Sequence, residues 1–168
     1  MDIRAASPED CNAIAAVHVA SWQAGYMGIL DPAFLAGLSV ERRAASWRQV
    51  LAEAQSELLV GCVGSSIVGF ASFGASRDAD APARRGELRA LYVVPHAWST
   101  GAGRELWLAA RARLLSLGLP TISLWVLEHN RRGIDFYSAA GFSVEPGSAK
   151  EFELGGTKLR EVRMVHAS

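Results

Sequence analysis

The stretch that decides the fold is ELRALYVVPHAWSTGAGR, residues 87–104. It opens with apolar strand formers, and Pro95 stops the strand because proline has no N–H to give to a ladder. Small residues follow, including Gly101 and Gly103, and from Arg104 apolar residues recur at helical spacing. A strand, a glycine-rich turn and a helix are typical of an anion site, because unpaired N–H groups and the helix dipole face the turn.

Two familiar nucleotide motifs do not fit this turn. A P-loop requires Gly-Lys-Ser/Thr, and no such triplet follows the glycines. A dinucleotide-binding turn requires a third glycine, but Leu106 stands at that position. The turn therefore predicts phosphate binding of another kind.

The longer string LYVVPHAWSTGAGRELW, residues 91–107, resembles the acetyl-CoA-binding motif of the GNAT superfamily of N-acetyltransferases. Residues 124–142, LWVLEHNRRGIDFYSAAGF, resemble the next motif of that family, in the same order and spacing. The resemblance implies an α/β (mixed α+β) GNAT fold, with one mixed, mostly antiparallel sheet, splayed central strands and helices on both faces. It also implies transfer of an acetyl group from acetyl-CoA to a primary amine, by direct attack in a ternary complex.

Composition sets further bounds. A chain of 168 residues with 50% apolar residues suits one domain over residues 1–168 with one core. Its 17 basic and 17 acidic residues balance, which argues against nucleic acid or an anionic membrane as the main partner. The N-terminal segment has no apolar signal region and no run is long enough to span a bilayer, so we expect a cytoplasmic protein, a monomer or homodimer, without a metal. Cys11 and Cys62 lie in apolar stretches and are expected to be buried free thiols.

Periodicity and turn residues give the order of elements as β-α-α-α-β-β-β-α-β-α-β-β. Helices are expected to begin at Ser7-Pro8, Asp31-Pro32 and Ser39, where each cap precedes a helical pattern. Residues 74–86 are small, polar and proline-containing, so they predict an exposed loop. The strands are expected near residues 1–5, 58–63, 67–73, 88–94, 122–127, 150–154 and 159–166, and two further helices near 104–117 and 131–140.

The family resemblance assigns cofactor contacts by position. It implies that the backbone of Leu91, Tyr92 and Val93 holds the pantetheine arm and the acetyl group. It implies that N–H groups of the following loop hold the pyrophosphate. The residues of that loop are Ser99, Thr100, Gly101, Ala102, Gly103 and Arg104. Trp98 stands where the family usually has glutamine or arginine, so a side-chain contact is missing there unless Ser99 and Thr100 replace it. Asn130 matches a cofactor-contacting asparagine, and it also suits the N-cap of the next helix.

The chemistry needs an acid for the departing thiolate and a base for the acceptor amine. Tyr137 matches the family tyrosine near the sulfur, although a core aromatic beside Phe136 is the alternative. Glu87, at the start of the central strand, is the first choice for the base, against an exposed strand-end charge. Glu128 is the second choice and His96 the third.

The acceptor site is expected between the N-terminal helices and the 74–86 loop. Trp22 and Tyr26 share one helix edge as i and i+4, and both are candidates to bind the substrate. Core packing is the alternative for Trp22. Two other functions stay open, a non-catalytic acyl-CoA-binding regulator and an interaction protein without CoA affinity.

Overall fold

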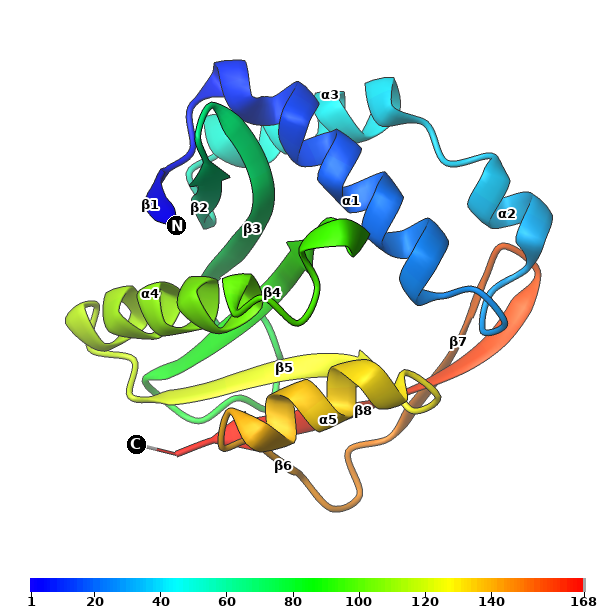
Figure 1. The fold of residues 1–168 in the computed structure, drawn as a ribbon. Coiled ribbons are helices and arrows are strands. Elements are labelled where there is room, and N and C mark those ends of the chain that lie inside the picture. Colours follow the sequence, from blue (N-terminus) through cyan, green and yellow to red (C-terminus); the bar gives the residue numbers. More distant parts are fainter. Residues whose placement is uncertain (168) are drawn as a thin grey trace.

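A computed structural model describes residues 1–167, which build one eight-stranded sheet in the order β1-β2-β3-β4-β5-β8-β6, with β7 also paired to β8 (Figure 1). Only β4 and β5 run parallel; the other neighbours are antiparallel. The strands are β1 (Asp2–Ala5), β2 (Glu57–Val63), β3 (Ser66–Ala75), β4 (Arg85–Val93), β5 (Thr121–Leu127), β6 (Ser143–Val144), β7 (Lys150–Leu154) and β8 (Thr157–His166).

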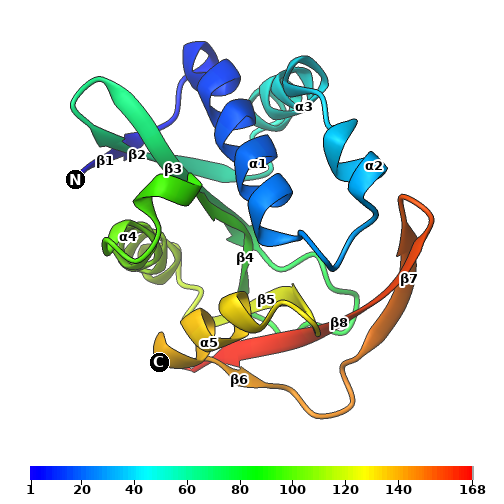
Figure 2. The same cartoon turned by 45° about the vertical axis from the view of Figure 1, so that its right-hand side comes forward.

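Helices cover both faces of this sheet (Figures 1 and 2). They are α1 (Cys11–Gly25), α2 (Pro32–Ala36), α3 (Val40–Ala52), α4 (Ala102–Ser116) and α5 (Arg131–Ala139), with short 3₁₀ turns η1 (Pro8–Asp10) and η2 (Pro95–Ala97). The mixed α/β architecture expected from the sequence is confirmed. Ser39 and Asp31 cap α3 and α2 as expected, since their side-chain oxygens accept N–H bonds from Arg42 and Phe34. The two-residue strand β6 was not expected.

Two cores lie on opposite faces of the sheet. On one face, α1 and α3 cover a cluster centred on Ile14 and Phe70. On the other, α4 covers a larger cluster that includes Leu106 and Leu124. A smaller third cluster joins the end of α1 and α2 to β8, around Leu35 and Leu159. Within residues 1–167, no helix combines the length and apolarity that a membrane span requires.

The segment between β3 and β4 is held more firmly than its composition predicted. We expected an exposed loop at residues 74–86, but β3 and β4 take in both of its ends. Within it, Asp78 and Asp80 bind the buried Arg163 of β8 at 3.1 and 2.7 Å. A single buried guanidinium far along the chain thus fixes the loop, which local composition cannot reveal.

Candidate active site

The two central strands separate after a short junction. β4 and β5 pair only at Arg85–Thr121, Gly86–Ile122 and Glu87–Ser123, although both strands continue well beyond. At the vertex, the buried Ser123 hydroxyl donates to the Gly86 carbonyl at 3.3 Å. Beyond it a cavity of about 990 Å³ opens, walled by β4, β5, the loop before α4, and α5.

The edge of β4 presents alternate backbone groups to this cavity. The Val94 N–H donates to the Val68 carbonyl at 2.8 Å, which makes these residues a hydrogen-bonded pair of the β3–β4 ladder. Because such pairs alternate along an antiparallel ladder, Tyr92 also turns its N–H and carbonyl toward β3. Leu91 and Val93 turn theirs toward the cavity, and neither residue pairs with any β5 residue in the described chain.

The start of α4 supplies further backbone donors. Gly101 precedes the helix with φ at 97°, a left-handed conformation that suits glycine. The first helical bond runs from the Glu105 N–H to the Gly101 carbonyl at 3.0 Å. The N–H groups of residues 102–104 therefore have no partner within the helix, and no side chain caps them. This arrangement suits phosphate oxygens.

The loop residues predicted to bind the cofactor divide into two groups. Ser99, Gly101, Gly103 and Arg104 line the cavity. Thr100 is exposed and does not line the cavity, and its hydroxyl donates to the Ala97 carbonyl within the loop at 2.8 Å. Ala102 is buried in the core beneath α4, so its backbone N–H is its only available polar contribution there.

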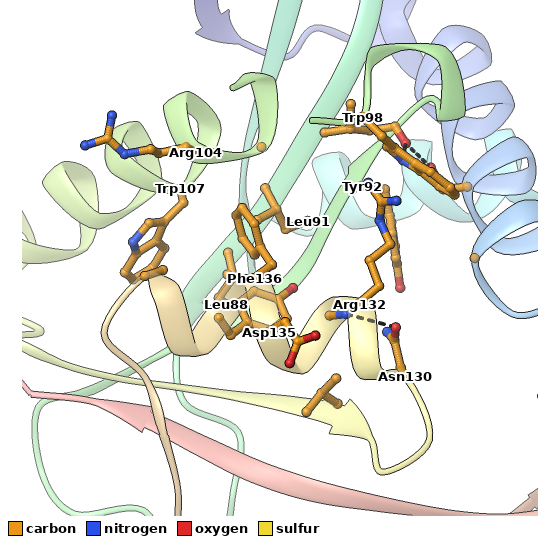
Figure 3. Close-up of a pocket in the computed structure, with 18 of the residues that line it drawn as sticks. Leu88, Leu91, Tyr92, Trp98, Arg104, Trp107, Asn130, Arg132, Asp135 and Phe136 are labelled. Carbon is orange, nitrogen blue, oxygen red and sulfur yellow. Dashed lines mark hydrogen bonds between the residues drawn. The ribbon is translucent and has the colours of Figure 1, made fainter. Parts of the chain in front are cut away.

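Trp98 folds over the end of β4. Its Nε1–H donates to the Val93 carbonyl at 2.6 Å, and the Ser21 hydroxyl donates to the same carbonyl at 2.8 Å. From α5, Arg132 reaches up to Trp98 (Figure 3), with the guanidinium carbon 3.8 Å from the indole centroid. Both side chains line the cavity, so together they narrow it between the loop and α5.

Asn130 caps α5 and also faces the cavity. Its Oδ1 accepts the Gly133 N–H at 3.0 Å, so the predicted N-cap is present. Gly133 fits this cap closely: a Cβ there would lie 2.6 Å from Nδ2 of Asn130. Asn130 lines the cavity as well, which leaves the capping and cofactor roles compatible.

Tyr137 lies on α5 with its ring against Phe136 and Phe142, at centroid distances of 5.2 and 5.7 Å. It also lines the cavity. Burial, together with the nearby Tyr92 phenol, raises the pKa of Tyr137 far above its usual value. The phenol is therefore neutral near pH 7 and has a proton to donate.

The two predicted carboxylates lie outside the cavity wall. Glu87 is buried at the vertex, where Arg77 binds it through the backbone N–H at 3.0 Å and the guanidinium at 2.6 and 3.0 Å. Glu128 follows β5, with its side chain 42% exposed and Arg160 at 3.9 Å. The structure does not bring either carboxylate to Tyr137.

Of the two residues predicted to bind the acceptor, only one lies at the cavity. Tyr26 lines the cavity, and burial raises the pKa of its phenol. Trp22 packs between Tyr26 and the stacked pair of His18 and Tyr92, outside the cavity wall. His18 is a buried core residue, and its Nδ1 accepts the Trp47 Nε1–H at 3.2 Å.

Three residues of this region were not predicted from the sequence. Arg132 and Trp125 line the cavity. Glu161 lies on β8 opposite Leu127 of β5, half-buried, and its charge influences Tyr26. Trp125 and Arg132 lie within the string 124–142, but the resemblance assigned them no role, and Glu161 lies outside both motifs, in a segment expected to be a strand.

A model of the acetyltransferase (GNAT) family matches residues 16–142. The chain belongs to this GNAT family. An uncharacterised N-acetyltransferase of Bacillus subtilis, YuaI, is 34% identical over 164 residues, covering 95% of this chain and 89% of YuaI. This relative supports an acetyltransferase.

Solved GNAT structures share the fold. The PaiA N-acetyltransferase of Thermoplasma acidophilum, solved with coenzyme A, superposes with a TM-score of 0.77 at 23% identity, covering 99% of this chain and 98% of that one. The yncA protein of Salmonella typhimurium, solved with acetyl-CoA as its cofactor, gives 0.74 at 23% identity, covering 99% and 93%. The resemblance found in the two sequence motifs is therefore confirmed at the level of family and fold.

Proposed function

We propose that this GNAT protein transfers the acetyl group of acetyl-CoA to a primary amine. The observation that carries the proposal is the cleft between β4 and β5, with open backbone groups on one wall and uncapped N–H groups at the start of α4. The N–H and carbonyl of Leu91 suit a pantetheine amide laid along β4. The donors of residues 102–104, with Arg104 beside them, suit the pyrophosphate.

In the proposed reaction, acetyl-CoA supplies a thioester and the acceptor supplies a neutral amine. The amine nitrogen bonds to the carbonyl carbon, and the carbon–sulfur bond breaks. The Val93 N–H, open to the cavity, is placed to donate to the carbonyl oxygen as negative charge grows there. Tyr137 gives its phenolic proton to the departing sulfur, and the proton that the nitrogen loses as the amide forms passes through water back to the phenolate.

The acceptor amine must also lose a proton. For an amine with a pKa of about 10.4, forming the neutral species at pH 7 costs about 4.6 kcal/mol. Of the two predicted bases, Glu128 is the more available, because its carboxylate is partly exposed while Arg77 binds that of Glu87. We propose that Glu128 takes the proton through water.

Thermal unfolding with coenzyme A tests the binding step. At a hundredfold excess over Kd, a ligand adds about 2.7 kcal/mol, which for a chain of this length raises Tm by about 5–10 °C. Release of free thiol from acetyl-CoA in the presence of a panel of primary amines then tests turnover. No shift and no calorimetric binding of coenzyme A would overturn the proposal, whereas binding without turnover of any amine would favour a non-catalytic regulator.

A further inference from the structure

A cation lies against the face of Trp125, at the cavity wall. The Nζ of Lys150, the first residue of β7, is 3.8 Å from the centroid of the Trp125 ring. The same nitrogen is 3.9 Å from Oδ1 of Asp78, while its side chain stays 57% exposed. An ammonium over an indole face gains stability from the ring quadrupole, and a nearby carboxylate adds to it.

The indole face is fixed in place without Lys150. The Trp125 Nε1–H donates to both oxygens of Asp78, at 3.1 and 3.2 Å. Arg163 holds Asp78 at 3.1 Å, and the remaining donors of Arg163 bind Asp80 and Glu145. Arg163, whose guanidinium carbon is 5.4 Å from the Trp125 centroid, shares Asp78 with Lys150. Because Asp80 and Glu145 also bind Arg163 and offset its charge, it does not cancel the attraction of this site for a cation.

A second carboxylate, that of Glu161, stands beside this face. Glu161 is the cross-strand partner of Lys150 and lies on the sheet face that Trp125 and Arg163 share. Within residues 1–167, the Glu161 carboxylate takes part in no hydrogen bond or ion pair, although the side chain is half-buried. Burial raises its pKa, and the charge of Lys150 opposes that shift. A half-buried carboxylate of this kind is stabilised by a cation beside it.

We propose that Trp125, Asp78 and Glu161 form a subsite for an organic cation, which Lys150 occupies while no acceptor is bound. The inference rests on the proposed amine acetylation and adds its substrate class. The reacting nitrogen must be neutral at the thioester, beside Leu91 and Val93. The subsite instead holds a nitrogen that stays protonated. The acceptor is therefore an amine with a second positive charge, such as an α,ω-diamine, and its distal ammonium displaces Lys150.

Calorimetric titration of the coenzyme A-bound protein tests the subsite. The probes are α,ω-diamines of four to eight carbons and the amino alcohols of the same length, which lack the second charge. At the best chain length we expect the diamine to bind about tenfold more tightly than the amino alcohol. Equal binding of the two probes at every length would overturn the proposal.

Lys150→Ala removes the internal occupant at an exposed position, where the fold does not depend on it. Because an occupied subsite lowers apparent affinity, we expect this variant to bind the diamine about tenfold more tightly. Lys158→Ala is the matched control, since it removes a lysine of equal charge from the same hairpin, at an exposed position of β8. Unchanged or weaker diamine binding in Lys150→Ala, or the same gain in Lys158→Ala, would contradict the role of Lys150.

Glu161→Gln completes the test, with an expected loss of about tenfold in diamine affinity and none in coenzyme A affinity. Equal losses for the diamine and the amino alcohol would show that Glu161 does not recognise the charge. Failure of coenzyme A to bind would instead count against the proposed function. The diamine titration on the protein alone would still report on the subsite in that case.

Discussion

The phenol of Tyr137 and the carboxylate of Glu87 lie near the same cleft, but they differ in protonation and in the partners that bind them. Burial keeps Tyr137 protonated, and the residue lines the cavity. Glu87 is held by three donors of Arg77 and is only 4% exposed. The phenol therefore carries a proton and lines the cleft, whereas the carboxylate is bound in an ion pair with Arg77.

Tyr137→Phe keeps the ring that packs on Phe136 and Phe142, so the fold should survive. Loss of a positioned acid lowers turnover by about 10²–10⁴-fold. We expect kcat to fall within that range while Kd for coenzyme A changes by less than about threefold, as measured by steady-state kinetics and calorimetry. Unchanged kcat would show that water protonates the thiolate, and loss of folding would show the hydroxyl to be structural.

Glu87→Gln separates a base from an ion-pair partner through the pH profile. A base matters most at neutral pH and little at alkaline pH, where the amine deprotonates unaided. Because Arg77 binds Glu87 away from the cavity wall, we expect an equal loss of turnover at pH 7 and at about pH 9.5. A loss confined to neutral pH would support the sequence-based prediction that Glu87 is the base. Glu128→Gln measured in parallel should show the neutral-pH loss instead.

Motifs predict residues whose role depends on their neighbours in the chain, and they miss residues that meet across the sheet. Tyr137 and Asn130 lie in one short string, so their place on the cavity wall could be predicted. Trp125 and Glu161 face the same region only because β8 returns beside β5, and no local pattern encodes that. For Trp98, the sequence showed a departure from the family pattern but not its hydrogen bond to Val93.

At the scale of the secondary-structure elements, α5 begins with a side-chain cap. Asn130 accepts the Gly133 N–H there, and the glycine leaves room for the asparagine side chain. Helix propensity alone predicts that a glycine here weakens the helix. The structure instead gives it a steric reason, since a Cβ would press on Nδ2 of Asn130.

A double-mutant cycle tests this arrangement. Asn130→Ala should cost about 1 kcal/mol through loss of the cap. Gly133→Ala gains helix propensity of about 1 kcal/mol but displaces Asn130, so alone it should be near neutral. In the Asn130→Ala background the same substitution should stabilise by about 1 kcal/mol, measured by chemical denaturation. Additive effects of the two changes would contradict the steric coupling.

For the molecule as a whole, Arg163 joins segments that are remote in the chain. This guanidinium on β8 binds Asp78 and Asp80 of the β3–β4 loop and Glu145 before β7. The order and most bounds of the elements could be predicted, because turns and periodicity are local. The anchoring of the loop by Arg163 could not, because its partners lie on either side of the core motifs.

Arg163→Met should destabilise the fold by about 3 kcal/mol, because it leaves partly buried carboxylates without their counter-ion. For a chain of this length, we expect a drop in Tm of about 6–12 °C by calorimetry. Arg160→Met is the control, because Arg160 lies three residues away on β8 with an exposed side chain, and it should change stability by less than about 0.5 kcal/mol. Similar effects of the two substitutions would refute a special role for Arg163.

The ion pair between Arg163 and Asp80 predicts a loss of stability in acid. Hydrogen bonds from Arg163 lower the pKa of Asp80 to about 2. Since this folded-state pKa lies below the ordinary value, the pair stabilises the protein at neutral pH and loses its effect as pH falls from about 4 to about 2. Thermal melts in this range should therefore fall more steeply for the wild type than for Arg163→Met.

The parting of β4 from β5 has a consequence for hydrogen exchange. Tyr92 and Val94 bond to β3, whereas the amides of Leu91 and Val93 face the cleft, in the middle of the sheet. In deuterated water, protection should therefore alternate over residues 91–94, slow at Tyr92 and Val94 and fast at Leu91 and Val93. A ligand lying along β4 would slow exchange at Leu91 and Val93 alone. The exchange rates of these two amides would therefore show whether a ligand covers the β4 wall of the cleft.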